Sequence, residues 1–184
     1  HDLNAIVQLC DKTMHIDKGI VAQMGPTNDV VNAYINSNSD NATFRKSDPT
    51  HAAKNASISL ISLAGNNGMP SSTFSIDEDI IIDFQLFIRK LDYPYSLLVL
   101  VLDSRKRRVF ACESDNIAEV MKLRIHPRTI VRGDYTITVL INIPSVGHID
   151  MVEDVCRFTV LDTGSRMAKH GGWDYGVVFG RYDW

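Results

Sequence analysis

Polar side chains alternate with apolar ones along three stretches of the sequence, and these polar positions carry its clearest binding chemistry. A period of two places such positions together on the wet face of a β-strand. Their carboxylate, amide, guanidinium and hydroxyl groups suit hydrogen bonds to sugar hydroxyls. If the strands are neighbours, they form one polar patch; the alternative is the ordinary solvated face of an antiparallel sheet. The candidates are Asp83, Gln85 and Arg89, then Thr136, Thr138 and Asn142, and finally Arg157 with Thr159.

A second candidate is the segment 170–176, HGGWDYG. Glycines flank Trp173 and Tyr175, so both rings could stand on a loop as stacking platforms for the C–H faces of sugars. The alternative is that Trp173 covers an edge of the fold as a hydrophobic plug. The basic run at 105–108 is either a solvated turn or a contact for an anionic sugar cap or lipid headgroups.

Catalytic and metal chemistry find little support in the sequence. His148 is close to Asp150, and His170 to Asp174, but no nucleophile stands in an elbow motif, so we expect no enzyme activity. The cysteines at 10, 112 and 156 have no CxxC spacing, so no metal site is expected. They fit reduced thiols, although a bridge between Cys112 and Cys156 across two sheets stays open.

Composition limits the class of protein. A hydrophobic content of 45% and a charged content of 22% are typical of a globular protein. The formal net charge of −3 argues against nucleic acid as a general partner, because phosphate binding needs a basic excess. No apolar run approaches the roughly 18 residues of a membrane-spanning helix.

The stretch 79–103 organises the predicted fold. Apolar residues alternate over 79–89 and are continuous over 97–102, which predicts two strands joined at the LDYP turn as a hairpin. A hairpin alone cannot bury so many apolar side chains, so a second sheet must exist. We predict a mainly β fold, an antiparallel immunoglobulin-like or jelly-roll β-sandwich. Its further strands are expected at 58–63, 107–113, 119–125, 135–143, 155–161 and 176–184.

A short α/β fragment precedes the sandwich. We predict a helix over 2–9, a hairpin of strands 12–17 and 20–24 turning at 18–19, and a helix capped by Thr27 that ends near Ile35. Residues 37–55 are rich in Asn, Ser, Asp and Lys, which predicts an extended or disordered linker. The expected division is therefore 1–36, a linker at 37–55, and the sandwich at 56–184.

The first 35 residues, HD…LCDKTMHIDKGIVAQMGPTNDVVNAYI, resemble the last part of an ABC-transporter ATPase domain. The resemblance implies that His1 is the switch histidine, which contacts the γ-phosphate of ATP in the full-length parent. ATP and Mg²⁺ would then be cofactors of that parent only. This chain contains no P-loop, acidic Mg²⁺ residue or signature motif, so we expect it to bind no cofactor of its own and not to hydrolyse ATP.

Residues 56–184 resemble the C-terminal carbohydrate-binding domain of Wzt-type O-antigen exporter ATPases. The resemblance rests on a strand around Phe84, then V-L-D-S-R, G-D-Y-T-I-T-V, F-T-V and a terminal G-V-V-F-x-R-x-x-W. It implies binding of the non-reducing end of lipid-linked O-antigen polysaccharide, which is thereby selected for export. It also implies a homodimer, in some cases with an exchanged last strand, and a membrane-spanning permease subunit as partner. The expected location is cytoplasmic, at the inner face of the bacterial inner membrane.

A different class of function stays open beside this one. The sandwich could be a dimerisation or regulatory module of the ATPase that makes no glycan contact. The sequence does not distinguish the O-polysaccharide serotype, its terminal cap, the face of the sandwich that would bind it, or whether the last strand is exchanged.

Overall fold

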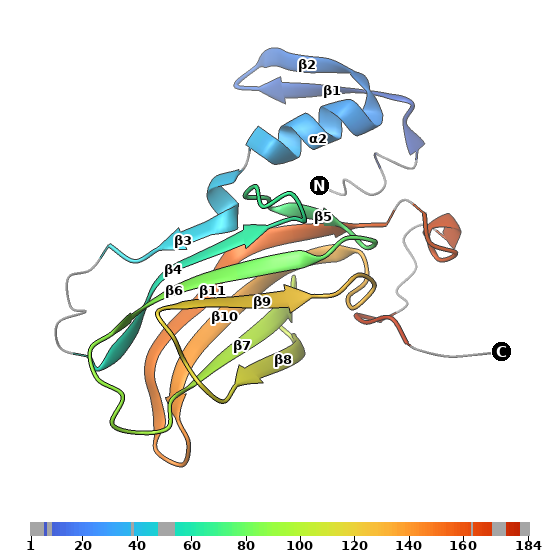
Figure 1. The fold of residues 1–184 in the computed structure, drawn as a ribbon. Helices are drawn as coiled ribbons and strands as arrows, with labels where there is room; N and C mark the ends of the chain where they lie inside the picture. Colours follow the sequence, from blue (N-terminus) through green and yellow to red (C-terminus); the bar gives the residue numbers. More distant parts are fainter. Residues whose placement is uncertain are drawn as a thin grey trace.

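Two β-sheets packed face to face make up most of the chain, after an N-terminal hairpin and one helix (Figure 1). The computed structural model describes residues 6, 9–37, 39–47, 54–162, 164–170 and 176–180. One sheet has the order β3 (Thr43–Arg45), β4 (Ala56–Ala64), β6 (Ile80–Ile88) and β9 (Val120–Ile125). The other has the order β5 (Thr73–Ser75), β11 (Gly147–Leu161), β10 (Gly133–Ile143), β7 (Ser96–Asp103) and β8 (Arg108–Ser114). Every pairing is antiparallel except that of β5 with β11, and the predicted mainly β sandwich is confirmed.

The core lies between the sheets, where both contribute alternate residues. Ile82 and Phe84 of β6 are at most 1% exposed, as are Ile137 and Ile141 of β10. Because β side chains alternate between faces, the same pattern leaves Asp83 and Gln85 on the outside. Full burial of one such apolar side chain contributes about 1.5–3 kcal/mol, so the two inner faces hold the sheets together.

The predicted hairpin of 79–89 with 95–103 is wrong. Strand β6 pairs with β4 and β9, whereas β7 pairs with β10 and β8 in the opposite sheet. The connection crosses between sheets, and the hydroxyl of buried Tyr95 donates to Asp92 Oδ1 at 2.8 Å within it. Both strands have an apolar face that packs into the same core. The sequence pattern of such a strand is the same whether its partner lies in the same sheet or in the opposite one, so the pattern could not exclude the hairpin.

The continuously apolar strand β7 lies inside the five-stranded sheet, between β10 and β8. Val99 and Val101 face the core and are at most 3% exposed. Leu98, Leu100 and Leu102 lie on the outer face and are half-buried. A strand with neighbours on both sides fits this continuous apolar run, and its outer leucines lie on the surface of the sheet.

The N-terminal hairpin and helix follow the prediction. Strands β1 (Lys12–Asp17) and β2 (Ile20–Pro26) turn at Lys18 and Gly19, which both have positive φ, and α2 covers Thr27–Ser37. The Thr27 side chain bonds the hairpin instead of the helix: its hydroxyl donates to Cys10 O at 2.5 Å and lies 2.8 Å from Thr13 Oγ1. Of the predicted helix 2–9, only Ile6 and Leu9 are among the described residues. No described helix is long and apolar enough to cross a bilayer.

Part of the predicted linker 37–55 belongs to the sandwich. A 3-10 turn, η1 (Ser39–Ala42), leads into β3, which pairs with β4 as an edge strand. Ala42 is fully buried and Phe44 packs against the core. Phe44 and the backbone hydrogen bonds of β3 thus attach part of a polar segment to the sheet. The composition of the segment did not predict this strand. The domain boundaries themselves stay a prediction.

The chain ends with little regular structure in its described part. After a short 3-10 turn, η3 (Ala168–His170), residues 176–180 form one isolated bridge, Ile130 with Val178. Two backbone bonds of 3.4 Å support it, from Val131 N to Val177 O and from Phe179 N to Thr129 O. The predicted last strand is thus a single bridge here, and residues 181–184 lie outside the described part.

Candidate functional site

The predicted polar patch is divided between the two outer faces of the sandwich. Asp83 and Gln85 lie on the four-stranded sheet, whereas the predicted residues of β10 and β11 lie on the five-stranded sheet. Arg89 follows the end of β6, is exposed, and donates its backbone N–H to Asn55 O at 2.8 Å. The condition for one patch, that the three strands are neighbours, is met only in part: β10 and β11 pair, but β6 belongs to the other sheet.

The outer face of the four-stranded sheet offers the simpler surface. Asp83 Oδ1 lies 3.1 Å from Lys122 Nζ in an ion pair whose side chains are 34% and 62% exposed. Gln85 stands opposite Val120, which is 72% exposed. The carboxylate is thus already paired by its neighbour on β9. This surface resembles an ordinary solvated sheet face.

The outer face of the five-stranded sheet combines polar and apolar rows. Along β10, three polar side chains and Leu140 stand directly opposite three leucines and a serine of β7. At one end, Ser96 Oγ donates to Glu113 Oε1 at 2.6 Å. A sugar presents both C–H surfaces and hydroxyls, so such adjacent rows match both. The opposed pairs are Thr136–Leu102, Thr138–Leu100, Leu140–Leu98 and Asn142–Ser96.

The pairing of β10 with β11 has three register shifts, and two of them are bulges opposite Thr136 and Thr138. Thr138 stands opposite two residues, 153 and 154, and Thr136 stands opposite 156 and 157. Asp154 and Cys156 have φ values of 55° and 51°, and such bulges bend a strand. The bulges turn Cys156 into the core and leave Arg157 exposed. No glycine marks these two bulges in the sequence, so the sequence did not predict their position.

Thr136 and Thr138 have different hydrogen bonding despite similar burial. Thr138 Oγ1 accepts the Asp154 N–H at 3.1 Å and so fixes the first bulge. Thr136 Oγ1 has no hydrogen-bond partner among the described residues, and the residue is only 4% exposed. A buried polar atom without a partner costs free energy. After the larger effect of Lys106, this hydroxyl nevertheless helps to lower the pKa of Asp154, so it lies beside that carboxylate and is not open to a ligand.

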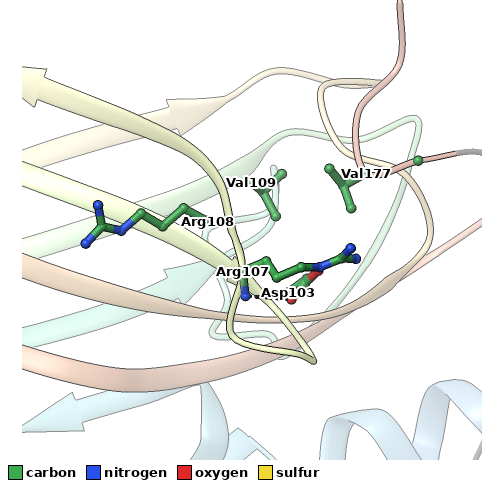
Figure 2. Close-up of a pocket in the computed structure, with 6 residues that line it drawn as sticks. Asp103, Arg107, Arg108, Val109 and Val177 are labelled. Atoms are coloured by element: carbon green, nitrogen blue, oxygen red, sulfur yellow. Dashed lines mark hydrogen bonds and ion pairs between the residues drawn. The ribbon is translucent and has the colours of Figure 1, made fainter.

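A hollow of about 240 Å³ lies between the β7–β8 turn and residues 176–177 (Figure 2). In it, Arg107 Nε donates to Asp103 Oδ2 at 2.7 Å. Figure 2 shows this pair side by side, Val109 and Val177 above it, and the Arg108 guanidinium pointing away. The prediction for the run 105–108 is a solvated turn or a contact for an anionic sugar cap or lipid headgroups. Nothing in the sequence indicated that Val177, about 70 residues away, would lie beside Asp103 and Arg107.

Asp103 is ionised in this hollow. Its burial raises the pKa, but the backbone and side chain of Arg107 and the backbone of Arg105 together hold the pKa below its usual value. Both backbone N–H groups donate to Oδ1 at 2.9 Å. The hollow therefore contains a carboxylate held by three hydrogen bonds and paired with the guanidinium of Arg107, whose side chain is 59% exposed.

Several predicted residues lie outside the described part of the chain: His1, Trp173 and Tyr175. Their predicted roles, contact with the γ-phosphate and stacking on sugars, stay predictions. Asp150 is described, and it pairs with lysines rather than with His148. Within the described ranges, no group of three or more His, Cys, Asp or Glu residues could hold a metal ion.

Comparison with known proteins gives similarity of fold. No family model matches the chain, and no curated protein matches its sequence. The crystal structure of the C-terminal domain of wzt is similar, with a TM-score of 0.48 and 13% identity over 76% of this chain and 87% of that one. β-Glucuronidases from Parabacteroides merdae (TM-score 0.39, 16% identity) and Bifidobacterium dentium (0.37, 14%) match 58% of this chain. The matched region covers only 14% and 18% of those two enzymes.

Proposed function

We propose that the chain binds the non-reducing end of lipid-linked O-antigen polysaccharide and selects it for export by an ABC transporter. The observation that carries the proposal is the order of two units. A hairpin, Gly-Pro-Thr and a helix, as at the end of an ABC ATPase, are followed by a two-sheet sandwich. The chain's own role is binding, whereas ATP and Mg²⁺ belong to the ATPase domain of the full-length parent. The partners are a permease subunit and a second copy, at the cytoplasmic face of the inner membrane.

The motifs that carry the sequence resemblance occupy defined places in the sandwich. V-L-D-S-R closes β7, F-T-V lies in β11, and G-D-Y-T-I-T-V opens β10. In the last motif, Gly133 has a φ of 154°, and a Cβ there would lie 3.4 Å from the Tyr135 hydroxyl. That hydroxyl donates to Val131 O at 2.8 Å and closes the turn into the strand. The glycine and the tyrosine of this motif therefore both have a structural role at the start of β10, and this supports the resemblance.

The outer face of the five-stranded sheet is the glycan surface we propose. It holds Thr136, Thr138, Asn142 and Arg157, four of the predicted contacts. The half-buried leucines of β7 supply apolar area for sugar rings, and half-buried Asn142 and exposed Arg157 supply hydrogen bonds. On the opposite face, Gln85 stands beside Val120, which is 72% exposed, and Asp83 is already paired with Lys122.

The test is a titration of the chain with O-polysaccharide from its own host and from unrelated serotypes. We expect selective binding that falls at least about tenfold in an Asn142→Ala, Arg157→Ala double variant, because each charged or polar contact contributes about 0.5–3 kcal/mol. The matched control is the Asp83→Ala, Gln85→Ala double variant, which alters the other face and is expected to bind normally. Absence of binding by the unaltered chain at millimolar sugar would contradict the proposal.

A dimerisation or regulatory module is the second candidate. The observation that favours it is the same apolar row, because half-buried leucines and Met151, which is 38% exposed, also suit a protein partner. Gel filtration with and without glycan separates the two functions. A purely structural module forms a dimer and does not respond to glycan.

A further inference from the structure

We infer that the hollow beside the β7–β8 turn binds one acidic sugar unit, a hexose-sized ring that carries a carboxylate or a phosphate. The inference rests on the proposed function, because the glycan would supply this unit. It concerns a different place from the outer face: Asp103 stands opposite Tyr135, whose side chain points into the core. The hollow is therefore a second contact point, at an end of the sandwich.

The size and walls of the hollow suit a single ring. Its volume of about 240 Å³ is below the roughly 300–1,000 Å³ of pockets that hold drug-sized ligands. Val109 comes from β8 and Val177 from the C-terminal segment, and in Figure 2 both stand above the ion pair. These side chains offer an apolar surface to the C–H groups of a ring.

The polar groups of the hollow favour a ligand rich in acceptor oxygens. The Asp103 carboxylate has about four lone-pair positions, and three already accept hydrogen bonds from Arg105 and Arg107. Arg107 has about five N–H groups, and within the described residues its side chain uses only Nε. The remaining guanidinium donors match vicinal hydroxyls, a carboxylate or a phosphate.

The charge around the hollow favours an acid over a neutral sugar. The turn carries four cations, of which Arg107 is paired with Asp103 and Lys106 with Asp154. Arg105 and Arg108 have no carboxylate within ion-pair distance among the described residues. Arg108 lines the hollow with its stem while its guanidinium points away, so it attracts an anion rather than bonding it.

The experiment uses the 184-residue chain with glucose, glucuronate and glucose 6-phosphate, observed by saturation-transfer NMR. We expect both acids to bind about fivefold more tightly than glucose, because ionised groups make stronger hydrogen bonds, and to weaken with added salt. The relative affinity of carboxylate and phosphate identifies which acid the hollow prefers. Equal binding of glucose and the two acids would overturn the inference.

Two matched pairs of variants locate the binding. Val177→Trp fills the hollow, whereas Val178→Trp changes the next residue, which is 46% exposed and does not line it. Arg107→Gln removes the donor, whereas Arg105→Gln removes an equal charge outside the hollow. We expect the first member of each pair to lose at least about tenfold in affinity, and the second to change about twofold or less. Thermal unfolding confirms that each variant is folded.

The same variants titrated with host polysaccharide separate the two proposals. One outcome is that the unaltered chain binds the polysaccharide, and that Val177→Trp and Arg107→Gln bind both the polysaccharide and the acidic sugars with unchanged affinity. In that case the inference fails and the proposed function stands. If the acids bind in the hollow but the polysaccharide does not bind, the proposed function fails and the hollow is still an acidic-sugar site. If neither binds, both proposals fail.

Discussion

Lys46 Nζ lies 2.9 Å from Asp150 Oδ1, and the Asp150 side chain is only 1% exposed. Lys54 Nζ reaches the same oxygen at 2.6 Å, and the Ile58 N–H donates to Oδ2 at 2.8 Å. The two lysines come from either end of the segment that joins β3 to β4, and the carboxylate comes from β11. One buried carboxylate therefore holds this segment against both sheets.

Replacing Asp150 by Asn is expected to destabilise the fold by about 2–4 kcal/mol. The change removes the charge on which two ammonium groups and one buried N–H depend, and loss of one partner from a buried pair is costly. Urea unfolding measures the free energy. The matched control is Asp83→Asn, which breaks an aspartate–lysine pair on the surface and should cost less than about 1 kcal/mol. Equal effects of the two changes would contradict a structural role for Asp150.

The stability contributed by Asp150 should disappear in acid. Burial raises the pKa of this carboxyl, but hydrogen bonds from Lys54, Lys46 and the Ile58 N–H outweigh burial and lower the pKa below its ordinary value of 3.8. A lowered pKa in the folded state means that the contribution is complete above the ordinary value and is lost as pH falls through the folded one. The difference in unfolding free energy between the unaltered chain and Asp150→Asn should therefore be constant near neutrality and shrink below pH 3.8. A pH-independent difference would refute this assignment.

The three thiols should react with Ellman's reagent in a fixed order at pH 8. Cys10 is exposed and should react first. Burial raises the pKa of Cys112 and raises that of Cys156 to about 12, so their thiolate fractions are small, and the thiolate is the nucleophile. We expect Cys156 to react only after denaturation. A bridge between Cys112 and Cys156 is wrong, because both thiols are free and β7 and β10 separate their strands in one sheet. Reaction of Cys156 in the folded chain as fast as Cys10 would contradict its burial.

Threonine-to-valine changes at the two positions opposite the bulges should have unequal effects. Thr138→Val removes the acceptor of the Asp154 N–H and should destabilise by about 1 kcal/mol. Thr136→Val removes a buried hydroxyl that makes no full hydrogen bond to a described residue but, after Lys106, helps to lower the pKa of Asp154, so it should destabilise less than Thr138→Val. Chemical unfolding of both variants measures the two effects, and equal destabilisation would show that the Thr136 hydroxyl is already fully bonded.

The local pattern of the sequence determined the elements. Alternation over 80–88 and 135–143 gave the strands and their inner faces, and the turn residues at 18–19 placed the hairpin of β1 and β2. These features depend on side-chain periodicity and backbone preference, which neighbouring residues carry by themselves. The sandwich class followed because so many half-apolar strands require two covered faces.

Only the tertiary structure decided how the strands are distributed and what they bring together. A strand has the same alternation in either sheet, so the sequence could not place β6 opposite β7 or divide the polar candidates between two faces. Lys46 forms an ion pair with Asp150, which is about 100 residues away in the sequence. Val177 likewise lies in the same hollow as Asp103 and Arg107, although it is about 70 residues away from them. Such contacts depend on the path of the whole chain, because periodicity defines a face and only long-range packing defines its neighbours.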